Sequence, residues 1–203
     1  MGIAVFANDE QWDEIKKNAL ATLCDRLGST KDINSTIDFF LILDETFLFD
    51  YTTTDKPVFI NQVVIPLHEM NLPTNVIRFN GWNGFIASSV WEVAGTITQP
   101  IHQKISSALK KRLIAVPDEP GFISARIIAM VINEAYFALS ENVGTKQAIN
   151  TAMRLGTNYP YGPFEWAEMI GINKIYALLQ KLSATDKRYA PAAVLCQEAL
   201  LWA

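Results

Sequence analysis

The apolar residues of this chain change their spacing part-way along it. Up to about residue 117, short apolar runs alternate with stretches in which apolar residues recur at helical spacing, whereas only helical spacing follows the Pro120–Gly121 pair. Short apolar runs between helices favour a mainly parallel sheet covered on both faces. The pattern therefore predicts an α/β half, residues 1–117, and an all-α half, residues 118–203. The runs predicted to be strands are 3–7, 39–43, 58–60, 76–79, 90–94 and 113–116.

Capping residues mark where several helices begin and end. Asn8 is a predicted N-cap with Gln11 at the capping-box position, and helical spacing of apolar residues continues to Leu27, before Gly28. A second helix is predicted to begin near Pro100. In the second half, helices are predicted for residues 123–139, 145–156, 163–171, 172–182 and 191–202.

The composition argues against several classes of protein. Half of the 203 residues are hydrophobic and 19% are charged, so the chain can bury a core. A net charge of −4 without a basic patch argues against a nucleic-acid surface. No apolar segment is long enough to span a membrane and no leader pattern opens the chain, so we expect a cytoplasmic protein. The two cysteines and two histidines lack metal-ligand spacing, so no metal site is predicted.

Two segments of the second half resemble a known family. Residues 154–171, RLGTNYPYGPFEWAEMIG, resemble the helical domain of the 3-hydroxyacyl-CoA dehydrogenase family, which carries a Pro-x-Gly-Pro-Phe-Glu segment. Residues 117–135, PDEPGFISARIIAMVINEA, resemble that family's domain junction. The resemblance implies a truncated Rossmann-like domain followed by the family's helical domain. It also implies a homodimer formed through the helical domain, and acyl-CoA as a ligand.

A third segment resembles the family's catalytic motif. Residues 78–95, RFNGWNGFIASSVWEVAG, resemble a His-Phe-Phe-Asn-Pro motif that is followed by a glutamate. The resemblance assigns Asn80 to the histidine, Asn83 to the asparagine and Glu92 to the glutamate. In the family, the histidine is the base that takes the alcohol proton as hydride passes to NAD, and the glutamate orients it. An amide cannot accept that proton at a useful rate, so Glu92 alone is kept from this pair.

NAD is implied by the resemblance only. A dinucleotide site needs glycines after the first strand, so that backbone amides can approach the pyrophosphate. The turn here is residues 8–11, NDEQ, which has no glycine and contains two acids that would repel a phosphate. Glu45 resembles a cofactor-facing acid of the family. We therefore expect that NAD is not bound.

Several side chains keep two interpretations. Glu92 is either a functional acid or a structural acid hydrogen-bonded to Asn80 or to a backbone amide. Asn80 is either a substrate contact or a turn residue, and His68 is a candidate replacement for the lost base. The aromatic residues that either line an acyl channel or fill the core are Tyr159, Tyr161, Phe164 and Trp166.

Three functions stay open on these observations. The first is a divergent dehydrogenase-family protein of fatty-acid metabolism that has lost hydride transfer and keeps acyl-CoA binding or a dimeric scaffold role. The second is an active 3-hydroxyacyl-CoA dehydrogenase, an oxidoreductase, with an altered catalytic dyad. The third is a structural or assembly subunit that associates through the apolar residues 199–202, ALLW.

Overall fold

The computed structural model describes residues 2–17 and 24–201. The chain divides into two compact units, Met1–Phe122 and Ile123–Ala203. The first unit combines a sheet with helices and the second is helical, which confirms the predicted fold class. The division falls after Phe122 rather than after residue 117, because the segment 118–122 is hydrogen-bonded to the α/β unit.

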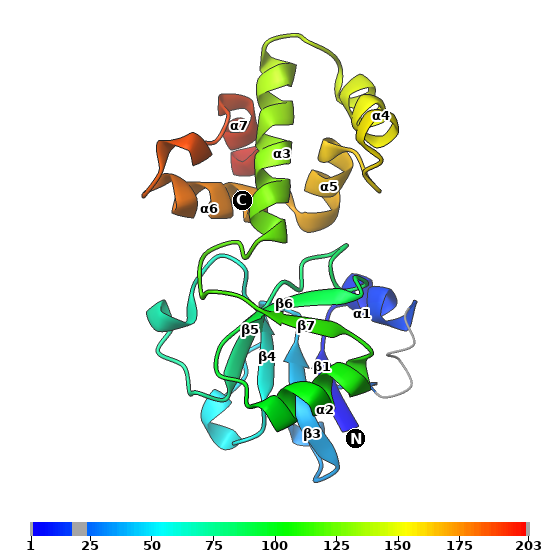
Figure 1. Ribbon diagram of the computed structural model, residues 1–203, viewed down its shortest axis with the longest axis vertical. Helices are drawn as coiled ribbons and strands as arrows, with labels where there is room; N and C mark the ends of the chain where they lie inside the picture. The colour runs from blue at the N-terminus through cyan, green and yellow to red at the C-terminus, as the bar shows by residue number, and fades with distance from the viewer. Residues whose placement is uncertain (1, 18–23, 202–203) are drawn as a thin grey trace. The chain divides into compact units, whose positions relative to one another are not determined.

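The α/β unit is built on one seven-stranded sheet with the strand order β2-β1-β3-β4-β5-β6-β7 (Figure 1). Neighbouring strands run parallel except β5 and β6, which are antiparallel. This is the mainly parallel sheet that the alternation of apolar runs and helices predicts. The strands span Gly2–Phe6 (β1), Cys24–Arg26 (β2), Ile37–Ile42 (β3), Val58–Asn61 (β4), Val76–Phe79 (β5), Val90–Ala94 (β6) and Arg112–Ala115 (β7).

The first helix, α1, spans Asp9–Lys16 and begins at the predicted capping box. The prediction that helical structure continues to Leu27 is wrong, because Cys24–Arg26 forms β2 and pairs in parallel with β1. Without β2, one side of β1 would carry unpaired N–H and C=O groups, and burial makes such groups costly. Leu27 extends the pairing, since its N–H donates to the carbonyl of Val5 at 2.9 Å. The predicted helical positions Ala19, Leu20 and Leu23 lie outside the described residues.

The two faces of the sheet are covered in different ways. On one face, α1 and α2 (Gln99–Leu109) contribute Ile15, Ile105 and Leu109 to the core. On the other face, the described α-helices contribute nothing to the buried cluster, and side chains from the strand connections cover it. The ring of Phe47 stacks on that of Phe6, with centroids 4.2 Å apart. Aromatic side chains of connecting segments therefore take the position that helices occupy on the first face.

The second unit consists of helices packed around α3. Asn133 of α3 is 2% exposed; its Nδ2 donates to the Ala190 carbonyl at 2.9 Å and its Oδ1 accepts from the Ala192 N–H at 2.8 Å. These bonds attach the segment before the last helix to α3. No described helix is both long and apolar enough to cross a membrane. The helices span Ser124–Ser140 (α3), Lys146–Thr157 (α4), Pro163–Ile170 (α5), Ile172–Ser183 (α6) and Ala193–Leu201 (α7).

We expect the substitution Phe49→Ala to lower the free energy of unfolding by about 3–5 kcal/mol. The reason is that it leaves a cavity in the buried cluster on the sheet face that the strand connections cover. Phe49 is 8% exposed, and its ring contacts those of Phe6, Phe40 and Tyr51. The neighbouring Leu48 is 93% exposed, so Leu48→Ala should change the same quantity by less than about 0.5 kcal/mol. Urea unfolding measures both variants, and equal losses would contradict the role assigned to Phe49.

Candidate functional site

Polar side chains join the ends of the parallel strands, and Asn61 at the end of β4 is at their centre. Asn61 is 3% exposed, and its Nδ2 donates to the Leu43 carbonyl and to the Glu45 carboxylate, each at 3.1 Å. Its Oδ1 accepts from the Gly81 N–H at 3.1 Å. A Cβ on Gly81 would lie 3.0 Å from the Cβ of Asn61, so the close approach requires glycine. The predicted site residue Glu45 therefore has a partner within the protein.

The N-terminus of α1 lies beside this network. The Gln11 N–H donates to Asn8 Oδ1 at 2.9 Å, and Gln11 Oε1 accepts from the Asn8 N–H at 3.1 Å. Gln11 Nε2 also donates to the Leu43 carbonyl at 2.9 Å. Asp9 and Glu10 place two carboxylates in the first turn. A pyrophosphate needs free amides and positive potential at this point, so these residues do not fit an NAD pyrophosphate.

Asn80, the residue directly after β5, lies opposite Glu92 of the antiparallel strand β6. The register pairs Phe79 with Val93, and the Asn80 N–H donates to the Glu92 carbonyl at 3.3 Å. Because side chains alternate along a strand, Asn80 and Glu92 project from the same face of the sheet. Asn80 is 3% exposed, and its Oδ1 accepts from the Trp82 N–H at 3.4 Å, which is the bonding of a turn residue. The structure thus brings together the two positions at which the family's dyad is expected.

Asn83 lies apart from that pair, in the segment 81–89 that connects β5 to β6, here called the 81–89 loop. Its Nδ2 donates to Glu10 Oε2 on α1 at 3.2 Å. One turn further along α1, Glu14 accepts from the backbone N–H groups of Gly84 at 2.9 Å and Ala87 at 2.8 Å. The acids of α1 therefore hold the 81–89 loop against the helix.

Lys111, directly before β7, is a residue of this region that sequence reasoning missed. It is 5% exposed, and its Nζ donates to the carbonyls of Ile86, Ala87 and Ser88 at 3.1, 3.0 and 2.6 Å. Burial lowers the pKa of the Lys111 ammonium, while the charge of Glu14 raises it. A lysine just after a helix normally indicates a solvated cation, so the sequence carries no signal for this contact.

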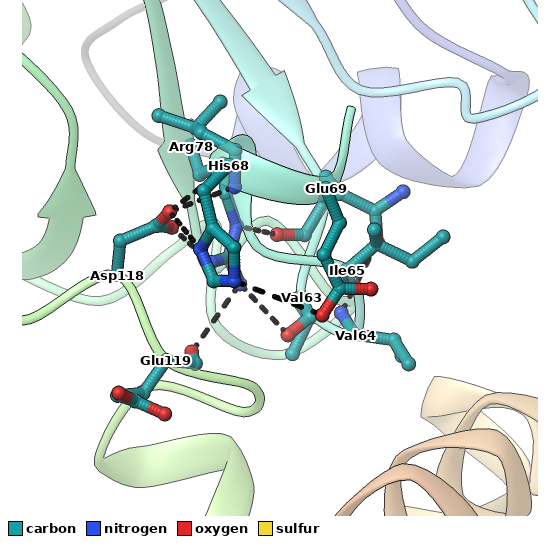
Figure 2. A network of polar contacts seen from close by, with 10 residues as sticks. Val63, Val64, Ile65, His68, Glu69, Arg78, Asp118 and Glu119 are labelled. Carbon is teal, nitrogen blue, oxygen red and sulfur yellow. Dashed lines mark hydrogen bonds and ion pairs between the residues drawn. The ribbon is translucent and has the colours of Figure 1, made fainter. Parts of the chain in front are cut away.

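Arg78 on β5 is the second residue that sequence reasoning missed, and it is fully buried (Figure 2). Its guanidinium forms an ion pair with Asp118 and donates to the carbonyls of Gln62 at 2.8 Å and Val63 at 3.0 Å. It also lies 4.6 Å from the ring centroid of Phe122. Burial lowers the pKa of Arg78, while its hydrogen bond to Asp118 raises it. The one available signal was a charged residue within the apolar run 76–79.

The structure places His68 in this network. Its Nδ1 lies 3.5 Å from Asp118 Oδ2, which also accepts from the Leu67 N–H at 2.8 Å (Figure 2). His68 is therefore a neighbour of the Arg78–Asp118 pair. The contacts described for His68 are with Asp118 and Glu69, and not with Asn80. Among the residues that the structure describes, no three His, Cys, Asp or Glu side chains come together to hold a metal ion.

The helical unit contains a cavity of about 700 Å³ whose wall includes Phe164. In that wall, the Tyr136 hydroxyl donates to Glu198 at 2.6 Å, and the Lys146 ammonium lies 2.6 Å from the same carboxylate. The other aromatic candidates for an acyl channel do not line it: Trp166 is buried, and the ring of Tyr161 packs edge-on against it at 5.0 Å. The core interpretation therefore applies to Trp166, while Phe164 is also largely buried and in addition lines the cavity.

Comparison with known proteins identifies the family. Residues 121–201 match the model of the 3-hydroxyacyl-CoA dehydrogenase C-terminal domain. The 3-hydroxyadipyl-CoA dehydrogenase of Escherichia coli (strain K12) is 45% identical over 93 residues, which cover 45% of this chain and 20% of that protein. The 3-hydroxybutyryl-CoA dehydrogenase of Clostridioides difficile is 29% identical over 162 residues, which cover 76% of this chain and 57% of that protein. This chain is a member of the 3-hydroxyacyl-CoA dehydrogenase-like family.

The fold of this dehydrogenase-like chain is also similar to solved structures. The (S)-3-hydroxybutyryl-CoA dehydrogenase of Ralstonia eutropha superposes with a TM-score of 0.68 at 20% identity, over 95% of this chain and 78% of that one. An identity this low shows a shared fold only. The chain spans less than two thirds of the length of the curated relatives named above. The match to the family model lies in the helical half, and the candidate site residues lie in the other half.

We expect Arg78→Met to lower the free energy of unfolding of the dehydrogenase-like chain by about 3–5 kcal/mol, because it leaves Asp118 without its buried partner. Arg112, also on a strand of this sheet, is exposed, so Arg112→Met serves as the control and should have little effect. Denaturant unfolding gives both values. If the two arginine variants lose the same stability, the buried pair is not what holds these segments together.

Proposed function

We propose that this chain is a divergent 3-hydroxyacyl-CoA dehydrogenase-like protein that no longer carries out NAD-linked hydride transfer. The observation that carries the proposal is the start of α1, where Asn8 and Gln11 cap the helix and two carboxylates occupy its first turn. Asn80 stands at the position of the family's base, and an amide does not serve as one. Both the cofactor end and the proton-transfer end of the reaction are thus altered in the same chain.

The role we propose to be kept is binding of an acyl-CoA. The support is the helical unit, which matches the family model over residues 121–201, while the relatives named above carry CoA-ester dehydrogenase names. Glu92 is then a structural acid rather than the partner of a base, in a strand whose main-chain carbonyl at Glu92 accepts from the Asn80 N–H. Whether hydride transfer survives in this chain is a separate question from whether it binds the ester, and the two can be measured independently.

We expect calorimetric titration with acetoacetyl-CoA to give saturable binding, and titration with NADH to give none up to about 1 mM. The physical reason is that the carboxylates in the first turn of α1 would repel a pyrophosphate, and the capping box occupies amides that would bind one. Free CoA is the control for recognition of the acyl group. Micromolar binding of NADH would favour an active dehydrogenase with an altered dyad. If neither ligand binds, the result would favour an assembly subunit.

We also propose a homodimer formed through the helical unit. Helix α4 has no buried residue, and Leu155 on it is 82% exposed. The charges of α4 pair within the chain, Lys146 with Glu198 and Arg154 with Glu165. The exposed face that bears Leu155 carries Ala148, Thr151 and Ala152 and no charged side chain. An uncharged face of small and apolar residues fits a second copy of itself in an isologous contact. At the predicted C-terminal surface, Leu200 and Leu201 are exposed, while Trp202 lies outside the described residues.

The substitution Leu155→Glu should convert the dimer to a monomer, because it would bury like charges against each other across a two-fold contact. Gln147→Glu is the matched control, since Gln147 is an exposed residue of the same helix about a quarter-turn away from Leu155. Light scattering during gel filtration measures the mass. An unchanged mass for Leu155→Glu, or a monomeric parent protein, would contradict dimerisation through α4.

A further inference from the structure

Two backbone amides of the 81–89 loop converge on one carboxylate. The Gly84 N–H donates to Glu14 Oε2 at 2.9 Å, and the Ala87 N–H donates to Glu14 Oε1 at 2.8 Å. Each oxygen of the carboxylate thus has its own amide donor. Gly84 has a φ of 88°, a left-handed conformation that glycine adopts without strain, and the N–H of the next residue, Phe85, donates to the Trp82 carbonyl at 2.9 Å. The Gly84 and Ala87 amides are therefore the two donors to the carboxylate, and the pair is here called the nest.

Lys111 orients the same loop from the opposite side. Its buried ammonium donates its three N–H groups to the carbonyls of Ile86, Ala87 and Ser88. A peptide unit whose oxygen points at a cation directs its N–H away from that cation. The peptide unit between Ile86 and Ala87 illustrates both effects, since the Ile86 carbonyl accepts from Lys111 and the Ala87 N–H donates to Glu14. The ammonium therefore polarises the loop so that its donors face α1.

We propose that the segment 84–87 is an anion-binding loop, that the Glu14 side chain is its resident ligand, and that the loop accepts a small carboxylate when Glu14 is withdrawn. The Glu14 carboxylate is chemically the head group of any aliphatic carboxylic acid, so it reports which ligand the loop fits. Glu14 is half-buried and projects from α1, so its carboxylate is held by these bonds rather than by enclosure in the core. The site is independent of the acyl-CoA proposal, because it uses none of the helical unit.

The surrounding charges favour a monoanion. Glu10 bonds the side chain of Asn83 in the same loop, so a second negative charge already lies near the nest. A phosphate dianion would be repelled by Glu10 more strongly than a carboxylate would. Lys111 supplies a single positive charge behind the loop, which balances one negative charge in front of it. The loop is therefore expected to prefer acetate to inorganic phosphate.

The test replaces the resident carboxylate and offers a free one. Glu14→Ala should unfold at a lower temperature than the parent, and acetate should raise its midpoint by about 3–6 °C at ten times the dissociation constant. Chloride at equal ionic strength should not reproduce the rise, and phosphate should give a smaller one. In the parent protein, where Glu14 fills the nest, acetate should have little effect.

Glu10→Ala is the matched control, because it removes a carboxylate from α1 whose bond is to a side chain and not to the nest. It should show no rescue by acetate. An equal response of both variants, or no acetate-specific response in Glu14→Ala, would overturn the proposal. If Glu14→Ala does not fold, Glu14→Ser, whose side chain is too short to fill the nest, is titrated instead while the amide protons of Gly84 and Ala87 are followed by NMR. Acetate must then shift those two signals, and their insensitivity would equally overturn the site.

Discussion

The guanidinium of Arg78 is a full positive charge in the interior of the α/β unit, and the surrounding segments must supply acceptors for its N–H groups. Its donors are met by Asp118 and by carbonyls of the segment that follows β4, so two stretches far apart in the sequence must stay where they are. The Val63 carbonyl also accepts from the Gly121 N–H at 2.8 Å. A buried charge that loses its partner is far more costly than a missing apolar contact. The segment 118–122 consequently belongs to the α/β unit, although it resembles a domain junction in sequence.

A second consequence concerns the carboxyl edge of the sheet, where ligands of parallel α/β proteins bind. In this chain the polar groups of that edge bond to one another: Asn61 joins the ends of β3, β4 and β5, while Gln11 ties α1 to Leu43. Each of these bonds uses a donor or acceptor that an open site would offer to a ligand. The altered family positions and this internal bonding support the same proposed loss of the cofactor.

Many of the helices and strands could be predicted from the sequence, because caps and apolar runs depend on residues that are close together in the chain. The capping box of Asn8 and Gln11, the cap at Thr145 and the helix start at Pro163 were predictable in this way. Strand β2 was not, since a strand of three residues exists only through its pairing with β1. Of the site, the resemblance predicted that Asn80 and Glu92 belong together. Arg78 and Lys111 were missed because their partners include backbone carbonyls, which any residue supplies and no sequence pattern marks.

The sheet face to which no described α-helix contributes a buried residue gives the α/β unit two covers of different stability. Helices carry their own backbone hydrogen bonds, so a face covered by α1 and α2 opens only when those helices lose their packing. The opposite face is covered by connections such as residues 43–57, which are held mainly by inserted aromatic rings. Those connections can detach as separate units while the strands stay paired. Amide hydrogens of the segments that cover the two faces then exchange with solvent through different openings, and length changes are better tolerated in the connections than in the helices.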